Sequence, residues 1–172
     1  MKKAIIVISV LAMLALVSCA STSNVDFSAL TEGVQKVIEV PNESKDALFV
    51  KANNWAVSAF NSADSVIEFS DKESGTITGK YTMKFQGNAW NLKLGGWKVS
   101  PLTLMEINIK EGKARITLKL VGVDLYNGYG VKSSGDLKTN FVQEDADILM
   151  MKWDNLITDF EKALTKTVSD DW

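Results

Sequence analysis

Histidine is missing from this chain of 172 residues, and cysteine occurs once, as Cys19. Without histidine there is no imidazole base for a Ser-His or Cys-His nucleophile and no imidazole ligand for a metal ion. A single cysteine cannot close an intramolecular disulfide, so the fold must be stabilised by packing. These absences exclude the most familiar catalytic centres, and we predict a protein that is not an enzyme.

Two weaker options for chemistry remain. Ser44 and Lys45 are adjacent, which is not the spacing of an S-x-x-K pair, and Ser44 suits a helix N-cap. Glu144, Asp145 and Asp147 form the densest acidic group, but no EF-hand spacing surrounds them, and acidic residues suit the first turn of a helix. We therefore predict neither catalytic residues nor a metal site.

Long hydrophobic runs are confined to the N-terminus. Lys2 and Lys3 precede an apolar stretch at positions 4–17, and a polar segment starts at Ser21. About 14 residues rise roughly 21 Å as a helix, which is shorter than a hydrocarbon core of about 30 Å. The segment is typical of a signal peptide and too short for a permanent transmembrane helix.

The sequence Leu16-Val17-Ser18-Cys19 resembles the bacterial lipobox, which implies cleavage between Ser18 and Cys19 and a covalent lipid on Cys19. An ordinary secretory signal, or a cysteine buried in the fold, remains the alternative. The lipid is the only cofactor that we expect, and it makes a membrane the first partner. Signals for export to the outer leaflet in Bacteroides-type lipoproteins resemble an acidic run just after the cysteine, and no such run follows Cys19. We therefore favour an envelope lipoprotein of the outer membrane that faces the periplasm.

We predict a signal peptide at 1–18, a lipidated cysteine with a polar tether at 19–32, and a single domain at 33–172. Cleavage would leave about 154 residues, which is enough for one hydrophobic core. It would remove two lysines and leave 17 basic and 21 acidic side chains, a net charge of −4. An acidic chain outside the cytoplasm argues against nucleic acid as a partner.

Hydrophobic periodicity predicts the order β-α-β-β-β-β-α. Thr76 to Phe85 alternates polar and apolar residues, and Glu111-Gly112 separates two further alternating runs as a tight turn. Strands are expected at 33–40, 65–70, 76–85, 105–109 and 114–120, and amphipathic helices at 44–62 and 144–168. This pattern predicts an α+β fold, an antiparallel sheet with both helices packed on one face.

Two sequence stretches carry a resemblance to a known family: 39–49, with Glu39-Val40-Pro41-Asn42 before Ser44-Lys45, and 71–79, with Glu73-Ser74-Gly75-Thr76-Ile77-Thr78-Gly79. From Gly33 to Leu120 the chain resembles a Bacteroides-type family of secreted proteins and lipoproteins with a domain of unknown function and a TATA-binding-protein-like (TBP-like) fold. The resemblance implies a curved antiparallel sheet but no substrate or reaction. The chain shows no internal repeat, so we expect a single TBP-like half.

The sheet face turned away from the helices is the first candidate site. Its lysines, among them Lys80, Lys84 and Lys119, offer a positive surface for phosphate or carboxylate groups of envelope glycans or lipids. The alternative is an ordinary solvated face with lysines that protect edge strands. The predicted members are Thr76, Thr78, Lys80, Thr82, Lys84, Glu106, Asn108, Lys110, Arg115, Thr117 and Lys119. The face lacks the apolar wedges of minor-groove binders, which again argues against DNA.

Two long connections form the second candidate site. Residues 86–101 contain Trp90 and Trp97, and residues 121–143 contain Tyr126 and Tyr129. Aromatic side chains on exposed loops can stack on sugars or anchor a protein partner. The alternative is that these aromatic residues extend strands or cap the core.

Two functional hypotheses follow. The first is non-catalytic binding of an envelope protein or glycan through the aromatic loops or the exposed sheet face. The second is a structural role, in which the domain self-associates through its sheet into a homodimer. A strictly monomeric domain would exclude the second hypothesis.

Overall fold

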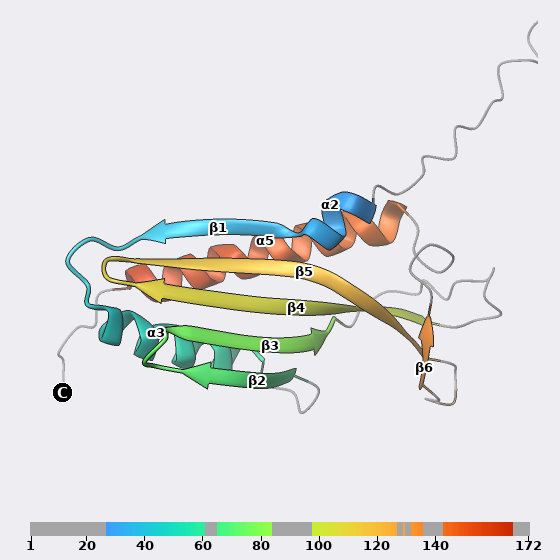
Figure 1. Ribbon diagram of the computed structural model, residues 1–172. Helices are drawn as coiled ribbons and strands as arrows, with labels where there is room; N and C mark the ends of the chain where they lie inside the picture. The colour runs from blue at the N-terminus through green and yellow to red at the C-terminus, as the bar shows by residue number, and fades with distance from the viewer. Residues whose placement is uncertain are drawn as a thin grey trace, which may run out of the picture.

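The computed structural model describes residues 27–60, 65–83, 98–126, 129, 132–135 and 143–166. The elements are α2 (Phe27–Glu32), β1 (Val34–Glu39), α3 (Lys45–Ala59), β2 (Ser65–Asp71), β3 (Thr76–Thr82), β4 (Lys98–Lys110), β5 (Lys113–Tyr126), β6 (Lys132–Gly135) and α5 (Gln143–Thr165). The strands are all antiparallel, in the order β1-β5-β4-β3-β2, and β6 pairs with the far end of β5. Figure 1 shows α3 and α5 on the same side of this sheet. The predicted α+β architecture is confirmed.

Helix α3 begins where the sequence predicts. Ser44 has an extended backbone, and its hydroxyl accepts a hydrogen bond from the Ala47 N–H at 3.2 Å, which makes it the N-cap. Leu48, Ala52 and Trp55 recur at helical spacing and are buried against the sheet. The helix ends at Ala59, three residues before the predicted end.

Helix α5 supplies the largest apolar stripe. Leu149, Trp153, Ile157, Phe160 and Leu164 are all buried, at spacings of three and four residues. Two acidic residues of its first turn match the positive end of the helix dipole, as the sequence predicts. These residues therefore belong to the hydrophobic core, which α5 shares with the sheet and with α3.

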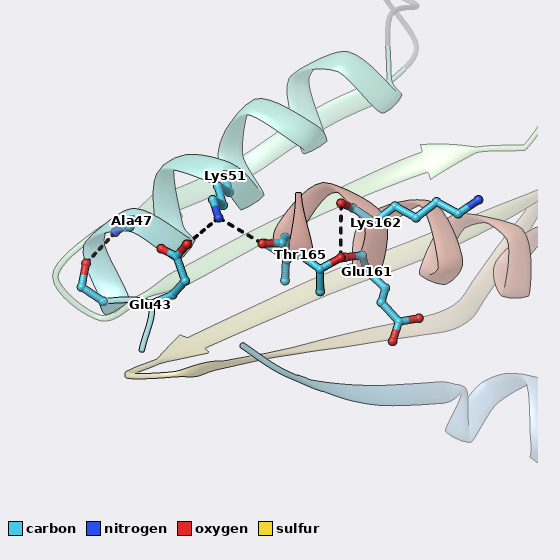
Figure 2. A network of polar contacts seen from close by, with 8 residues as sticks. Glu43, Ala47, Lys51, Glu161, Lys162 and Thr165 are labelled. Atoms are coloured by element: carbon cyan, nitrogen blue, oxygen red, sulfur yellow. Dashed lines mark hydrogen bonds and ion pairs between the residues drawn. The ribbon is translucent and has the colours of Figure 1, made fainter. Parts of the chain in front are cut away.

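Polar contacts fix α3 against α5. The Trp55 indole N–H donates to Asp159 at 2.9 Å, and the Trp55 and Phe160 rings lie 4.7 Å apart. At the other end of the pair, Lys51 Nζ contacts Glu43 at 2.8 Å and the Leu164 carbonyl at 3.2 Å (Figure 2). Lys51 thus caps an otherwise unpaired carbonyl in the last turn of α5.

Three polar side chains are buried together between the helices and the sheet. Trp153 Nε1–H donates to Thr103 Oγ1 at 3.2 Å, and both side chains are fully buried. The hydroxyl of Tyr81, which is paired with Thr103 across β3 and β4, lies nearby without a hydrogen bond of good geometry. Burial raises the pKa of the Tyr81 phenol well above its usual range, although Thr103 and Trp153 oppose the shift.

The structure adds elements that periodicity does not predict. Helix α2 occupies the last part of the predicted tether and buries Leu30, so the folded unit begins before residue 33. Strand β4 starts at Lys98, which corrects the predicted loop at 86–101 at its C-terminal end. The predicted loop at 121–143 is also wrong in part, because it contains the end of β5, β6 and the first residue of α5.

Candidate functional site: the outer sheet face

The face of the sheet opposite α3 and α5 is called the outer sheet face here. Strand pairing sets its members in rows that run across the sheet. One row contains Gln35, Thr117, Glu106 and Thr78, a second Val37, Arg115, Asn108 and Thr76, a third Lys119, Leu104 and Lys80, and a fourth Glu39, Lys113 and Lys110. The helices do not pack on these side chains, which are exposed or half-buried.

The predicted binding lysines share this face. Lys80 on β3 and Lys119 on β5 flank Leu104 of β4, so their backbones lie two strand spacings apart, about 9.6 Å. Thr82 also belongs to this face, beside Leu102. Lys84 lies outside the described residues.

The basic side chains of this face differ in how far they are neutralised. Lys80 forms an ion pair with Glu68 at 3.2 Å, whereas Arg115 donates to the neutral amide of Asn108 at 2.5 Å. Over the part of the chain that the structure describes, the side chains of Lys110, Lys113 and Lys119 make no ion pair or hydrogen bond. The uncompensated positive charge therefore follows the β4–β5 hairpin.

The hairpin that carries these charges is held firmly at its tip. The Gly112 N–H donates to the Glu43 carbonyl at 3.0 Å, and the Val40 N–H donates to the Gly112 carbonyl at 2.8 Å. A Glu111 carboxylate oxygen accepts from the Lys45 N–H, in the first turn of α3, at 2.9 Å. Gly112 has a φ of 70°, a conformation that favours glycine at this turn. The tip is thus anchored to the start of α3.

Gly33 holds the other end of the charged strand in close contact. It ends α2 with a φ of 84°, and its N–H donates to the Ala29 carbonyl at 3.0 Å. A Cβ built on Gly33 would lie 2.6 Å from Cγ of Lys119 and 2.2 Å from the Leu118 carbonyl oxygen. The stem of Lys119 therefore lies directly on this glycine, which fixes where the side chain leaves the sheet.

Of the aromatic candidates, Tyr126 lies away from the predicted binding lysines. Tyr126 ends β5 as a half-buried strand residue, seven residues and about 23 Å along the strand from Lys119. Tyr129 is 95% exposed. Trp90 and Trp97 lie outside the described residues, as do Ser18 and Cys19. Tyr126 and Lys119 thus lie at different places along β5.

One buried carboxylate was not predicted from the sequence. Asp124 is only 6% exposed; it accepts a hydrogen bond from Thr82 Oγ1 at 3.2 Å and contacts Lys132 of β6 at 2.9 Å. The register between β4 and β5 shifts between Leu102 and Thr103, so alternation counted from Leu120 assigns the wrong side beyond Val121. The two consecutive apolar residues Leu120 and Val121 are the available signal of this bulge.

Other kinds of site are absent from the described residues. Among them no three histidine, cysteine or acidic residues gather closely enough to hold a metal ion. None of the helices described is long and apolar enough to span a bilayer. The outer sheet face is thus the candidate site with the clearest chemistry.

Comparison with known proteins identifies the fold. A family model described as a domain of unknown function (DUF4468) with TBP-like fold matches residues 35–122. A solved DUF4468 family protein from Bacteroides ovatus is 17% identical with a TM-score of 0.50, over 87% of this chain and 93% of that one. A TBP-like protein from Parabacteroides distasonis is 16% identical with a TM-score of 0.57, over 78% and 92%.

The comparison with curated proteins gave no match. At 16–17% identity, the solved structures share only the fold with this chain. The family match covers the sheet from β1 to most of β5, together with α3, and it agrees with the resemblance found in the sequence. The chain belongs to the DUF4468 family of TBP-like domains.

Proposed function

We propose that this protein is a non-catalytic binding module of the bacterial cell envelope. A lipid on Cys19 holds it on a membrane, and the outer sheet face receives an anionic ligand. The carrying observation is the positive charge on the hairpin, where Lys110, Lys113 and Lys119 lack ion-pair partners among the described residues. The ligand class is a phosphate- or carboxylate-bearing glycan, lipid or protein of the envelope.

Charge repulsion supports this assignment. Lys110 and Lys113 are directly opposite each other across the hairpin, and like charges in that position destabilise a sheet. Glu39, the cross-strand neighbour of Lys113, forms no ion pair that relieves the repulsion among the described side chains. A bound anion would offset this repulsion. An anionic ligand would therefore stabilise an arrangement of charges that folding alone leaves unfavourable.

Self-association through the sheet is the second candidate, and the edge strands β1 and β2 argue against it. On β1, Lys36 points to the helix side and pairs with Glu161 at 2.7 Å, and an inward charge discourages pairing with another strand. On β2, the register shifts between Ile67 and Phe69, and such a bulge also protects an edge. Face-to-face pairing would bring two positive surfaces together.

The binding proposal is tested with the chain from residue 20 onward, which contains every described element. Its binding to polygalacturonate and to phosphatidylglycerol vesicles is measured at low salt, with neutral galactan and phosphatidylcholine vesicles as references. We expect Lys80→Glu with Lys119→Glu to weaken anion binding about tenfold or more. We expect the triple variant, which also carries Lys84→Glu, to bind these anions no more tightly than the double variant does.

The control reverses charge elsewhere. Lys162 and Lys166 are exposed at the end of α5, and their double change to Glu alters the net charge by the same amount. We expect this control to retain binding within about threefold. Equal loss in both double variants, or no preference for anions in the parent protein, would overturn the proposal. Sedimentation of the same samples tests self-association, for which a stable dimer would be the supporting result.

The anchor is tested in cells. We expect metabolic labelling with palmitate, followed by mass spectrometry of the mature N-terminus, to place the lipid on Cys19. Cys19→Ser should abolish labelling and move the protein out of the outer-membrane fraction. Labelling that persists in Cys19→Ser would contradict this part of the proposal.

A further inference from the structure

We infer that the anionic ligand is a linear polymer whose chain lies along β5. This inference rests on the proposed function and specifies its ligand. In the first half of β5 the outward positions are Lys113, Arg115, Thr117 and Lys119, so three of four consecutive outward side chains are basic. They form a single line of charge on the outer sheet face, one strand in from the β1 edge.

The backbone makes this line straight and evenly spaced. Outward side chains of a strand recur every second residue, about 6.6–6.8 Å apart, so the four positions span about 20 Å. From Lys113 to Leu118, β5 pairs without a register shift with β1 on one side and β4 on the other. Strands on both sides, and the anchored hairpin tip, keep the line in place.

Two acidic side chains lie beside this line and not in it, and the outward carboxylate of Asp124 on β5 lies beyond Lys119, where it contacts Lys132. Glu39 is the β1 neighbour of Lys113, and Glu106 is the β4 neighbour of Thr117. A polymer along β5 would therefore meet positive charge at three positions and a neutral hydroxyl at the fourth. A polymer laid across the strands would meet a carboxylate in the rows of Lys113 and Thr117.

The spacing also distinguishes a polymer from a compact ligand. Sites for one phosphate bring several donors to within hydrogen-bond distance of the same group. Lys113 and Lys119 leave the strand about 20 Å apart, so one phosphate cannot contact all three cations of the line. A repeating anion, such as a glycan with a carboxylate on each sugar, meets successive cations of the line.

The test is a gain of function at the neutral position. Thr117→Lys completes the line of cations, whereas Thr78→Lys adds the same charge in the same row two strands away, about 9.6 Å from β5. Affinity is measured for oligogalacturonides of one, three, six and ten sugars, with fully methyl-esterified chains as neutral references. We expect Thr117→Lys to tighten binding of the longer chains about three- to fivefold and Thr78→Lys to change it less than twofold.

The outcomes separate this inference from the proposed function. Equal tightening by Thr117→Lys and Thr78→Lys would overturn the alignment along β5 and leave anion binding by the face intact. The alignment along β5 would also be overturned, with anion binding by the face left intact, if single sugars bound as tightly as long chains. Much tighter binding of phosphatidylglycerol vesicles than of any oligogalacturonide would have the same meaning. Failure of the parent protein to bind any anion would overturn both. A circular dichroism spectrum of each variant checks that the substitution leaves the fold unchanged.

Discussion

The two faces of the sheet use the same strands for opposite purposes. On β5, Ala114, Ile116, Leu118 and Leu120 point to the helices and are almost completely buried, while Lys113, Arg115 and Lys119 on the alternate positions carry three positive charges. The helix side is closed by rings and indole hydrogen bonds, and the described residues form no comparable ring or indole contact on the outer side. We propose that folding and binding are assigned to alternate residues of one strand, and a substitution should then affect one or the other.

The largest effect is expected on the helix side, at Trp153. Trp153→Ala removes the largest fully buried side chain and its hydrogen bond to Thr103, so we expect a loss of about 3–5 kcal/mol in the free energy of unfolding. Urea denaturation followed by circular dichroism measures it. On the exposed side of the same helix, Met151→Ala should cost less than about 0.5 kcal/mol. Similar losses in both variants would show that the two sides of α5 are not distinct.

The next largest effect on stability is expected at Gly33, which lies against Leu118 and Lys119 of β5. Gly33→Ala places a Cβ 2.2 Å from the Leu118 carbonyl oxygen in a left-handed conformation, so we expect a loss of about 2 kcal/mol or more. Thermal unfolding gives the measurement. Gly122→Ala is the matched control, because its Cβ would meet only Leu102 at ordinary contact distance. If Gly33→Ala proved as stable as Gly122→Ala, the close contact with β5 would not exist.

The sequence predicts the regular parts of both faces well. Strict alternation in β3 and in the β4–β5 hairpin is sufficient to assign each residue to a side, because side chains of a strand point alternately up and down. Helices α3 and α5 follow from their apolar stripes and their N-terminal residues. What these predictions share is a period maintained over many residues.

The missed features lie where that period breaks. Pro101 suggests a loop, yet it is paired within β4; its carbonyl accepts from the Met83 N–H on the β3 side. The N–H and carbonyl of one strand residue point to the same side of the strand. An N–H on Pro101 would therefore point toward the end of β3, so its absence removes no hydrogen bond to β5. Helix α2 and strand β6 are too short for a detectable period, and the bulge at Val121 hides Asp124.

A smaller effect is expected from the buried hydroxyl of Tyr81. Because burial raises the pKa of this phenol in the folded protein, its contribution to stability is complete below the unfolded value near pH 10 and is lost as the pH rises above it. We expect the parent protein to lose up to about 1.4 kcal/mol per pH unit more than Tyr81→Phe above pH 10. Urea denaturation of both proteins between pH 9 and 11 measures the difference, and parallel curves would contradict a buried phenol.

The smallest effect on folding is expected at Arg115, on the outer sheet face. Arg115→Thr keeps a good strand former and removes only an exposed guanidinium that donates to Asn108, so stability should change by less than about 0.5 kcal/mol. The same substitution should weaken binding to long oligogalacturonides several-fold, because it breaks the line of cations on β5. A loss of stability comparable to that of Gly33→Ala would mean that this face contributes to the fold itself. Since the neighbouring Ala114 and Ile116 are buried, only the outward position can change binding while the core stays intact.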